Sequence, residues 1–527
     1  MAGSEEVFEG SAYEVDTVPK SMTSLRRSVA GAAFASGTVE MLTRALTIVL
    51  SIATARALQP TEVGLLGLAV ILVGVPSLVT ACAESAGVIG RSLGSDQQYA
   101  WSATVARAVI TTCLLAVAPF LLPPLAHLLA GKETASADLM ALAQLLLWQL
   151  VIDVAVTYPR VLLQRRLTLT LLVSASLLQI TTHVGLSLVL LREGYGAFGV
   201  ACSTLISAGL SGAFLWCGLF AHRGLGWGGK VQAALRYQIL ASTTRVFAGS
   251  FVGYLNRCLD NLLVAWILGP AAMSFYGMAW SASRIPMWVL QQALGLVLIP
   301  ALTHIRSDTE RVERMLSESL RHAYLLLLPV CAALFITADS LVTTVLGVKW
   351  LPIVPALRVM SVSVLMAPLV IAFNGLLVAM DRAHLTGLAS GAQLVTIVVL
   401  VVPLATRWGV VGAAFGDLGS TIILSLVLFV LCRLRVPKVR WEVAPAAVLP
   451  VAAATSAGLV ASVLSTGLPV GVMKLASEAC VLAVGYLAII WVLGGRGRLE
   501  ELAGLVREVA RRPAPVIVGS GRTGDSA

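Results

Sequence analysis

Charged and aromatic residues are scarce in this chain. Of its 527 residues, 12% are charged and 6% are aromatic, whereas 58% are hydrophobic, and the mean hydropathy is +0.89. Soluble domains of this composition could not keep most of the chain in water, so we expect it in a lipid bilayer. The sequence also gives no sign of the alternation that is typical of β-strands.

Clusters of metal or redox ligands are missing as well. The eight cysteines are scattered, nearly all inside apolar runs and without a C-x-x-C pair, and the histidines do not cluster. This pattern supports neither a disulfide framework nor a metal site. We expect no metal and no other cofactor.

The sequence lacks the long polar loops of a membrane enzyme. Membrane polymerases and glycosyltransferases usually carry catalytic residues in a sizeable segment outside the bilayer, and none is present here. We therefore expect a protein that is not an enzyme.

Two glycine-rich segments imitate nucleotide-binding motifs. Residues 224–231 have the phosphate-loop spacing, but Val231 stands where the magnesium-binding Ser or Thr belongs. Residues 519–524 imitate a dinucleotide fingerprint, yet the sequence offers no helix after them to receive a pyrophosphate. We interpret the two segments as a linker and a disordered tail, and we do not expect transport driven by ATP bound to this chain.

Apolar runs long enough to cross a bilayer fill the rest of the chain. A hydrocarbon core of about 30 Å needs roughly 20 apolar residues per helix. The runs predict an all-α polytopic membrane protein with fourteen transmembrane helices, over residues 34–57, 63–88, 101–128, 137–160, 169–191, 197–220, 240–267, 271–301, 322–346, 353–380, 386–406, 409–432, 443–464 and 474–494.

The chain carries an internal duplication. Leu58, Pro60 and Gly67 recur in register as Leu268, Pro270 and Gly277, and Gly196 and Gly199 recur as Gly409 and Gly412. Six expected helices separate each element from its copy, so the halves are parallel and pseudo-symmetric about the membrane normal. The expected divisions are a cytoplasmic tail (1–28), a first six-helix lobe (29–221), a cytoplasmic linker (222–239), a second six-helix lobe (240–433), two added helices (434–496) and a cytoplasmic tail with an amphipathic helix (497–527).

Lysine and arginine placement predicts the orientation. Most basic residues fall in alternate loops, whereas the opposite loops hold only Arg56, Lys132, Arg192, Lys349, Arg407 and Lys474. By the positive-inside rule both termini face the cytoplasm. The net charge of +10 largely reflects this bias and favours contact with anionic membrane lipids over nucleic acid. The first twenty residues are acidic where a signal peptide needs basic ones, so none is expected.

Two cytoplasmic segments have apolar residues at helical spacing among charges. One is Thr303 to His322, with Val312, Leu316 and Leu320 on one face, and the other follows Leu499. Each suits a helix at the lipid interface and equally a helix packed on neighbouring spans.

Three arginines within the expected spans are the candidate substrate ligands. Arg44, Arg257 and Arg284 lie roughly 20 to 24 Å from the turns at Pro60 and Pro270. A charge at mid-bilayer costs about 2.5 to 3.5 kcal/mol or more, which something must offset. Glu40 can meet Arg44 and Asp260 can meet Arg257 on one helix face, whereas Arg284 needs a partner from another helix, or water.

The arginines at similar depth predict the inward end of a cleft between the lobes. Guanidinium groups there suit a phosphate or diphosphate, and the alternative for each is local pairing or snorkelling. Candidate ion-coupling carboxylates are Asp260, which is preferred, and Asp153, Asp417 and Glu40; Arg107 is a further buried charge. We expect His183 to be a packed or hydrogen-bonded residue of its helix.

Several segments resemble a known family. The segment from Ala55 to Leu65 (ARALQPTEVGL) resembles the ARLLGPEDFGL hallmark of Wzx-type flippases, members of the polysaccharide transporter family in the multidrug, oligosaccharidyl-lipid and polysaccharide exporter superfamily. The likeness continues in order to about residue 440, through residues 162–166, 260–263, 268–270, 275–279, 284–286, 299–302 and 346–350.

The resemblance implies a MATE-like exporter with two lobes and fourteen helices. It implies that the chain flips undecaprenyl-diphosphate-linked oligosaccharides, precursors of exopolysaccharide, capsule or lipopolysaccharide O-antigen, across a bacterial inner membrane. Alternating access, cation coupling and partnership with a polysaccharide polymerase and a chain-length regulator are further expectations. The alternatives are a cation-coupled drug or metabolite antiporter, a lipid II flippase, a membrane polymerase or glycosyltransferase, and a non-transporting scaffold.

Overall fold

The computed structural model describes residues 22–89, 95–130, 133–166, 168–221, 233–306, 308–435, 456–458, 460, 463 and 471–489. Throughout these residues the chain is helical and contains no strand. The helices are α1 (Met22–Ala57), α2 (Pro60–Ile89), α3 (Asp96–Ala130), α4 (Glu133–Arg165), α5 (Leu169–Arg192), α6 (Gly196–Ala221), α7 (Ala233–Leu268), α8 (Pro270–Ser283), α9 (Ile285–Ile305), α10 (Thr309–Ile336), α11 (Ala338–Val345), η1 (Val348–Ile353), α12 (Val354–Ser363), η2 (Val364–Met366), α13 (Ala367–Ala379) and α14 (Ala383–Arg435).

Each expected span up to residue 432 falls on helix, in some cases in two or three pieces. Ten helices of the described part are long and apolar enough to cross a membrane, among them 472–489 near the C-terminus. The helix α14 has 53 residues, about 80 Å at 1.5 Å per residue, which is far longer than one crossing needs. Its backbone is broken at Trp408 and Gly409, between the two spans expected there.

The internal duplication has a structural counterpart in the turns. The helices α2 and α8 both begin at a proline, Pro60 and Pro270, whose fixed φ suits the first helical position. Gly196 and Gly409 both have positive φ, 61° and 60°, a conformation that glycine adopts without strain. The residues that recur in the sequence therefore make the same kind of turn in both halves.

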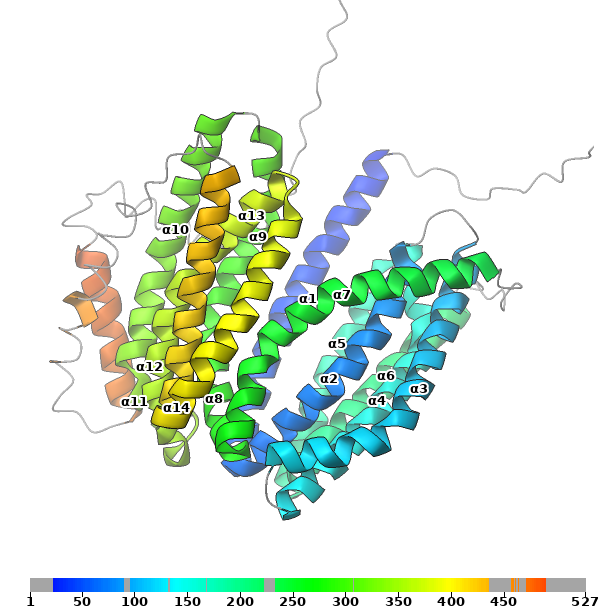
Figure 1. Cartoon of the computed structure of the whole chain (residues 1–527), viewed down its shortest axis with the longest axis horizontal. Coiled ribbons are helices and arrows are strands. Elements are labelled where there is room, and N and C mark those ends of the chain that lie inside the picture. The colour runs from blue at the N-terminus through cyan, green and yellow to red at the C-terminus, as the bar shows by residue number, and fades with distance from the viewer. Residues whose placement is uncertain are drawn as a thin grey trace, which may run out of the picture.

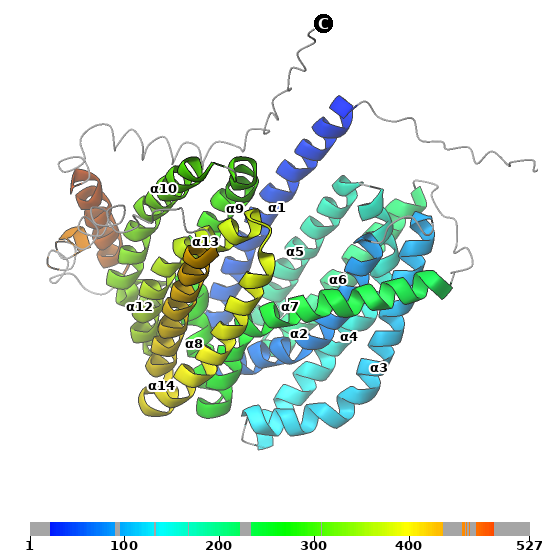
Figure 2. The ribbon, with the colours of Figure 1, turned by 45° about the horizontal axis from the view of Figure 1, so that its top comes forward.

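Two groups of helices lie side by side (Figure 1). The first helix group is α2–α6 and the second is α8–α14. Helix α1 lies between them, and α7 passes from the second group across α2 and α3 of the first, as the rotated view also shows (Figure 2). Tyr254 on α7 donates a hydrogen bond to the Ile71 carbonyl of α2 at 2.7 Å, where Gly74 leaves room for the tyrosine ring.

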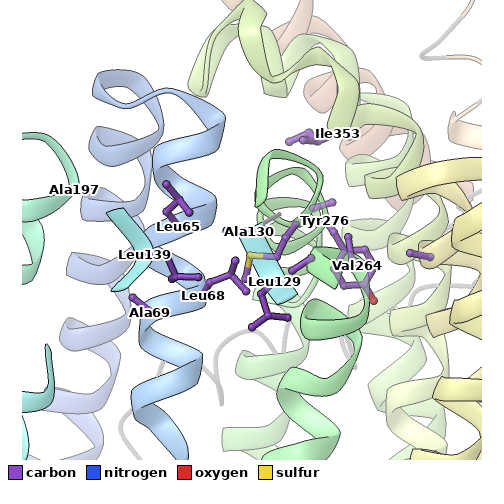
Figure 3. Packing of buried hydrophobic residues seen from close by; sticks show 14 of the residues in the cluster. Leu65, Leu68, Ala69, Leu129, Ala130, Leu139, Ala197, Val264, Tyr276 and Ile353 are labelled. Carbon is purple, nitrogen blue, oxygen red and sulfur yellow. The ribbon is translucent and has the colours of Figure 1, made fainter. Parts of the chain in front are cut away.

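The largest apolar core joins the two groups at one end, which we name the closed end. It contains the α1–α2 and α7–α8 turns, with Leu58, Leu68, Met273, Tyr276 and Trp350 among its buried members, and Figure 3 shows part of it. Gly64 permits this contact, since a Cβ there would lie 2.0 Å from the Pro270 carbonyl oxygen. Away from this end, the buried apolar clusters of the described residues stay within one group or join it to α7.

The segment before residue 322 is packed on neighbouring spans. Val312, Leu316 and Leu320 of α10 are buried in the core of the second group, beside Leu302 and Phe373. Of the two readings of this amphipathic pattern, the packed helix is the one formed. The helix starts at Thr309, where the Asp308 side chain accepts a hydrogen bond from the Arg311 amide.

Several expected divisions lie wholly or largely outside the described residues. These are most of the N-terminal tail, most of the linker, most of the added helix pair and the whole C-terminal tail with its amphipathic helix. The helix α7 begins at Ala233, inside the segment expected to be the linker.

Candidate functional site

Arg44 joins α1 to the second helix group. Its guanidinium pairs with Glu40, one turn earlier, at 2.7 Å and lies over the Trp288 ring of α9, 4.9 Å from its centroid. The Glu40–Arg44 pair expected from their spacing is therefore formed, and Arg44 has a cation–π contact as well. The pair remains partly exposed, with side-chain exposures of 46% and 37%.

Arg257 lies on α7 between the contacts that this helix makes with α2 and with α8. Tyr254 of the same helix contacts α2, and Asp260 contacts Tyr276 of α8. At about 100° per residue, Arg257 lies on the face of α7 midway between these two contacts. Arg257 is exposed, and a Cβ placed at neighbouring Gly253 would meet nothing within 4 Å except Arg257 Nη1, at 3.9 Å.

The expected contact between Arg257 and Asp260 is not formed. Asp260 is buried and accepts hydrogen bonds from the Tyr276 hydroxyl and the Asn261 amide, both at 2.8 Å. Over the described residues Arg257 makes no ion pair. Within that part of the chain its guanidinium is therefore an exposed cation without a carboxylate partner.

Arg284 finds its partner on a distant helix, as its isolation in the sequence required. It lies at the junction of α8 and α9, where Pro286 cannot continue the hydrogen-bond ladder, and pairs with Asp417 of α14 at 3.2 Å. It also lies over the Trp280 ring at 4.8 Å. The other Asp417 oxygen accepts a hydrogen bond from Ser363 of α12 at 2.8 Å.

Asp260 and Asp417 form one buried cluster with Arg284. Both Asp417 and Arg284 act electrostatically on Asp260, and the three side chains join α7, the α8–α9 junction and α14. Among the described residues, Arg284 pairs directly with Asp417 alone, and Asp260 is a second buried carboxylate within reach of its charge. A bound cation or proton could balance the remaining negative charge.

The first helix group holds a second buried charge cluster. Arg107 on α3 is 2% exposed and pairs with Asp153 of α4 at 3.0 Å and with Glu84 of α2. Glu84 also accepts from Arg160 at 3.3 Å. Asp153 and Arg107 thus offset each other, although the buried Nε of Arg107 has no hydrogen-bond partner among the described residues.

Sequence reasoning did not single out Glu84. The available signal was an acid near the end of an apolar span, but its partners come from two other helices and cannot be read from local spacing.

The closed end carries a set of hydrogen bonds that we name the clasp. Arg56 donates to the carbonyls of Thr344 and Val345 at 2.6 and 2.8 Å. In return Lys349 donates to the Arg56 and Leu58 carbonyls at 3.0 and 2.6 Å, and the Trp350 indole donates to the Ala55 carbonyl at 2.8 Å. The sequence predicts that Arg56 and Lys349 both lie on the less basic side of the membrane. It does not predict that they form hydrogen bonds between the two segments.

Metal binding finds no support in the part of the chain that the structure describes. There, no three His, Cys, Asp or Glu side chains lie close enough together to hold a metal ion. His183 of α5 is hydrogen-bonded to Ser203 of α6 at 3.1 Å, as expected for a residue packed within its helix bundle.

Comparison with known proteins gives a family match over more than half of the chain. Residues 53–355 match the family described as polysaccharide biosynthesis protein. This match spans the α1–α2 turn, α7 and the α8–α9 junction, and therefore includes Arg257 and Arg284.

Individual relatives align over shorter stretches. A stretch of 139 residues is 29% identical to the lipopolysaccharide biosynthesis protein WzxC of Escherichia coli K12, covering 26% of this chain and 28% of that protein. A stretch of 222 residues is 23% identical to the probable low-salt glycan biosynthesis flippase Agl15 of Haloferax volcanii, covering 40% and 47%. The alignments span less than half of each relative's length.

Two solved structures share the fold. One is the lipid II flippase MurJ in an inward closed conformation, with a TM-score of 0.72 and 12% identity over 87% of this chain and 98% of that one. The other is a multidrug resistance MATE family transporter of the MOP superfamily in an inward-facing conformation, with a TM-score of 0.60 and 18% identity over 74% and 94%. The comparisons thus group the chain with flippases and transporters, not with enzymes.

Proposed function

Because this chain belongs to the family of polysaccharide biosynthesis proteins, we propose that it is a flippase for lipid-linked oligosaccharides. It moves undecaprenyl-diphosphate-linked sugar units from the cytoplasmic to the periplasmic leaflet of a bacterial inner membrane. The observation that carries this proposal is Arg257, whose guanidinium is exposed and has no carboxylate partner among the described residues, on the face of α7 between its contacts with α2 and α8. A diphosphate is the anion whose oxygens match a guanidinium fork.

In this proposal Arg257 makes the first contact with the diphosphate. Arg44 and Arg284 remain candidates for the same anion, but each must first leave a carboxylate, Glu40 or Asp417. The sugars occupy the hydrated space between the helix groups while the prenyl chain stays in lipid. Because the polar headgroup and the apolar tail occupy separate environments, the sugar hydroxyl groups do not incur the free-energy cost of transfer into hydrocarbon.

The orientation follows from the basic loops. With both termini cytoplasmic and fourteen spans in two six-helix lobes and an added pair, the closed end faces the periplasm and the open space faces the cytoplasm. Substrate enters from the cytoplasmic side. The two lobes then rotate relative to each other, and the hydrogen bonds of the clasp break.

Cation coupling is assigned to the Asp260–Asp417 cluster. When a proton or sodium ion binds there, it offsets the excess negative charge, and when it leaves, Asp417 holds Arg284 more firmly. Since the cluster joins α7, α8 and α14, its charge state is well placed to bias the packing of these helices. Asp153 and Glu40 are weaker candidates because arginines match the carboxylates in number around each of them, whereas, in the described part of the chain, Arg284 alone accompanies Asp260 and Asp417.

Reconstituted vesicles test the proposal. Purified protein is inserted into vesicles that contain a fluorescent undecaprenyl-diphosphate oligosaccharide, and the fraction accessible to a membrane-impermeant quencher is followed over time. The proposal expects protein-dependent exposure of substrate from the inner leaflet, absent from protein-free vesicles. Equal rates with and without protein, in the presence and absence of a cation gradient, would refute it.

A further inference from the structure

A cavity of about 620 Å³ lies between α1, α5 and α6, apart from Arg257 and the carboxylate cluster. Hydrogen-bonding side chains contributed by all three helices line it, namely Glu40 and Thr43 of α1, Gln179 and His183 of α5, and Thr204 and Ser207 of α6. Its volume falls in the range of small-molecule sites, about 300 to 1,000 Å³.

Such a lining is costly in helices of this kind. The helices α1, α5 and α6 are each apolar enough to cross a membrane, and polar groups that face hydrocarbon without partners are strongly disfavoured. Two ionisable residues, Glu40 and His183, face the same hollow, and intramembrane ionisable groups usually mark a substrate or ion route. Because most of the remaining lining is apolar, the cavity suits a guest that has both hydrogen-bonding and apolar faces.

The lining has hydrogen-bonding capacity left over. Among the described residues the Gln179 amide has no hydrogen-bond partner, so its donor and acceptor are both available. The Thr204 and Ser207 hydroxyls donate to carbonyls of their own helix, which leaves their oxygens as acceptors. The Ser203 hydroxyl contacts His183 through Nδ1, and the other ring nitrogen of His183 stays free of that contact.

The charges of the lining residues indicate which kind of ligand the cavity can bind. Among the described residues, neither Lys nor Arg lines the cavity, and the one carboxylate there, Glu40, already pairs with Arg44. An anion such as a diphosphate or a uronate would meet the Glu40 carboxylate here and no cation among the described lining residues. Leu172, Val173 and Ile180 alternate with the polar groups along α5, as suits a molecule that presents both hydroxyl groups and C–H faces.

We propose that this cavity is a subsite for neutral sugar residues of the transported oligosaccharide. The inference rests on the proposed function and adds a specificity site to it: Arg257 takes the diphosphate, while Gln179, His183 and the hydroxyls of α6 hydrogen-bond the glycan. The site selects neutral sugars and disfavours uronic acids.

Glycan binding in the subsite weakens the contact between α1 and α9. Glu40 lines the cavity and also holds Arg44, which lies over Trp288 of α9. A sugar hydroxyl that donates to Glu40 competes with the Arg44 guanidinium for the carboxylate oxygens. Glycan binding thereby loosens the arginine that joins α1 to the second helix group.

The test compares three synthetic carriers in vesicles that contain the full chain. These are undecaprenyl diphosphate bearing a neutral disaccharide, the same lipid bearing a uronic-acid disaccharide, and the sugar-free lipid. The variants are Gln179→Leu with His183→Leu, and separately Ser176→Phe, which fills the hollow from an exposed position on its rim. Thr181→Leu, an exposed residue of α5 outside the lining, is the matched control.

The wild type and the control are expected to flip the neutral carrier about tenfold faster than the uronate carrier, the ratio produced by the loss of one or two hydrogen bonds. Both cavity variants should lose this preference while flipping the sugar-free lipid at the wild-type rate. Unchanged preference in folded cavity variants overturns the subsite, as does a wild type that flips the neutral and uronate carriers equally.

A binding measurement separates failure of the subsite from failure of the flippase proposal. In a background without native cysteines, Ser176→Cys is labelled with a maleimide in detergent, with and without free neutral disaccharide. Protection by the neutral sugar and not by the uronate supports the subsite even where no carrier is flipped, a result that would refute only the proposed function. Equal labelling under all conditions overturns the subsite, whatever the transport assay shows.

Discussion

Arg257 is the side chain on which substrate affinity should depend most. Replacing it with alanine removes the unpartnered guanidinium beside α2 and α8. A hydrogen bond to a charged group contributes about 1.5 to 3 kcal/mol, so the apparent KM for the diphosphate carrier should rise by about ten- to a hundredfold. The Arg257→Lys variant should recover part of the loss, because lysine keeps the charge without the planar fork.

The control for this prediction lies on the same helix. Arg245 is exposed and half a turn away from the face that contacts α2, so Arg245→Ala should leave the apparent KM unchanged. An Arg257→Ala variant whose KM matches that of the Arg245 variant would contradict the assignment. Flipping rates at several carrier concentrations in vesicles separate KM from the maximal rate.

Asp260 is expected to control coupling without controlling affinity. Asp260→Asn keeps an oxygen that can accept from the Tyr276 hydroxyl, so the local packing is retained, but the excess negative charge over Arg284 disappears. Transport driven by a proton or sodium gradient should become independent of the gradient, while carrier affinity stays near that of the wild type. The exposed Asp138 gives the matched control, Asp138→Asn, and retained gradient dependence in Asp260→Asn would argue against this role.

The intramembrane charges show how far single residues can be read from sequence. The Glu40–Arg44 pair was predictable, because residues four apart on a helix meet on one face. The need of Arg284 for a distant partner was predictable too, but Asp417, 133 residues away, was not, since no local pattern encodes a contact between helices. The expected Arg257–Asp260 contact fails because the Tyr276 hydroxyl from α8 and the Asn261 amide bind the carboxylate instead.

Among the helices, α10 offers a direct test of packing. Leu316 is 2% exposed in the core of the second helix group, so Leu316→Ala should cost about 2 to 5 kcal/mol of stability. Glu310, on the same helix with 85% of its side chain exposed, should change stability by less than about 0.5 kcal/mol when replaced with alanine. Thermal unfolding in detergent measures both, and near-equal values would indicate that this part of α10 lies on the lipid surface instead.

The break in α14 offers a second test of packing, because the two halves of the helix approach closely there. A Cβ at Gly412 would lie 1.9 Å from the Leu404 carbonyl oxygen, so Gly412→Ala must push apart the two halves of the helix and should destabilise the protein strongly. At Gly391, in the same helix, a Cβ meets nothing within 4 Å. There, Gly391→Ala should be neutral or stabilise by about 0.5 to 1 kcal/mol. Equal unfolding temperatures for the two variants would contradict the tight packing at the break.

The helices were more predictable than their surroundings. Hydropathy and the prolines at Pro60 and Pro270 placed α2 and the start of α8 to within a few residues, because bilayer thickness and proline geometry act locally. The end of α8 at Ser283 was not predicted, since one span was expected over 271–301. The amphipathic pattern around Leu316 left two interpretations open. A helix at the lipid interface and a helix packed on its neighbours both have apolar residues at the same helical spacing. Packing against Leu302 and Phe373 decided between them, and that information lies elsewhere in the chain.

Across the whole molecule, the clasp should set the balance between conformations. Lys349→Met together with Trp350→Phe removes three donated hydrogen bonds while keeping most of the apolar contact. The ratio of open to closed forms at this end should rise at least about tenfold, since each lost bond contributes about 0.5 to 3 kcal/mol. Electron–electron distance measurements between labels at Tyr195 and Val348, both exposed, report this ratio.

The same-side control for the clasp is Arg192→Met. Arg192 is exposed at the end of α5 and takes no part in the clasp. The distribution of label distances in the Arg192→Met variant should therefore match that of the wild type. A clasp variant with an unchanged distribution would show that the apolar core alone keeps this end closed. In that case the hydrogen bonds of Arg56, Lys349 and Trp350 would serve only to satisfy buried carbonyls.

The most direct measurement is an experimental structure of the protein with a bound undecaprenyl-diphosphate oligosaccharide, determined in lipid nanodiscs. The account predicts the diphosphate between the two helix groups, with phosphate oxygens within hydrogen-bond distance of the Arg257 guanidinium. A diphosphate bound elsewhere on the molecule, with Arg257 free or turned toward lipid, would contradict it.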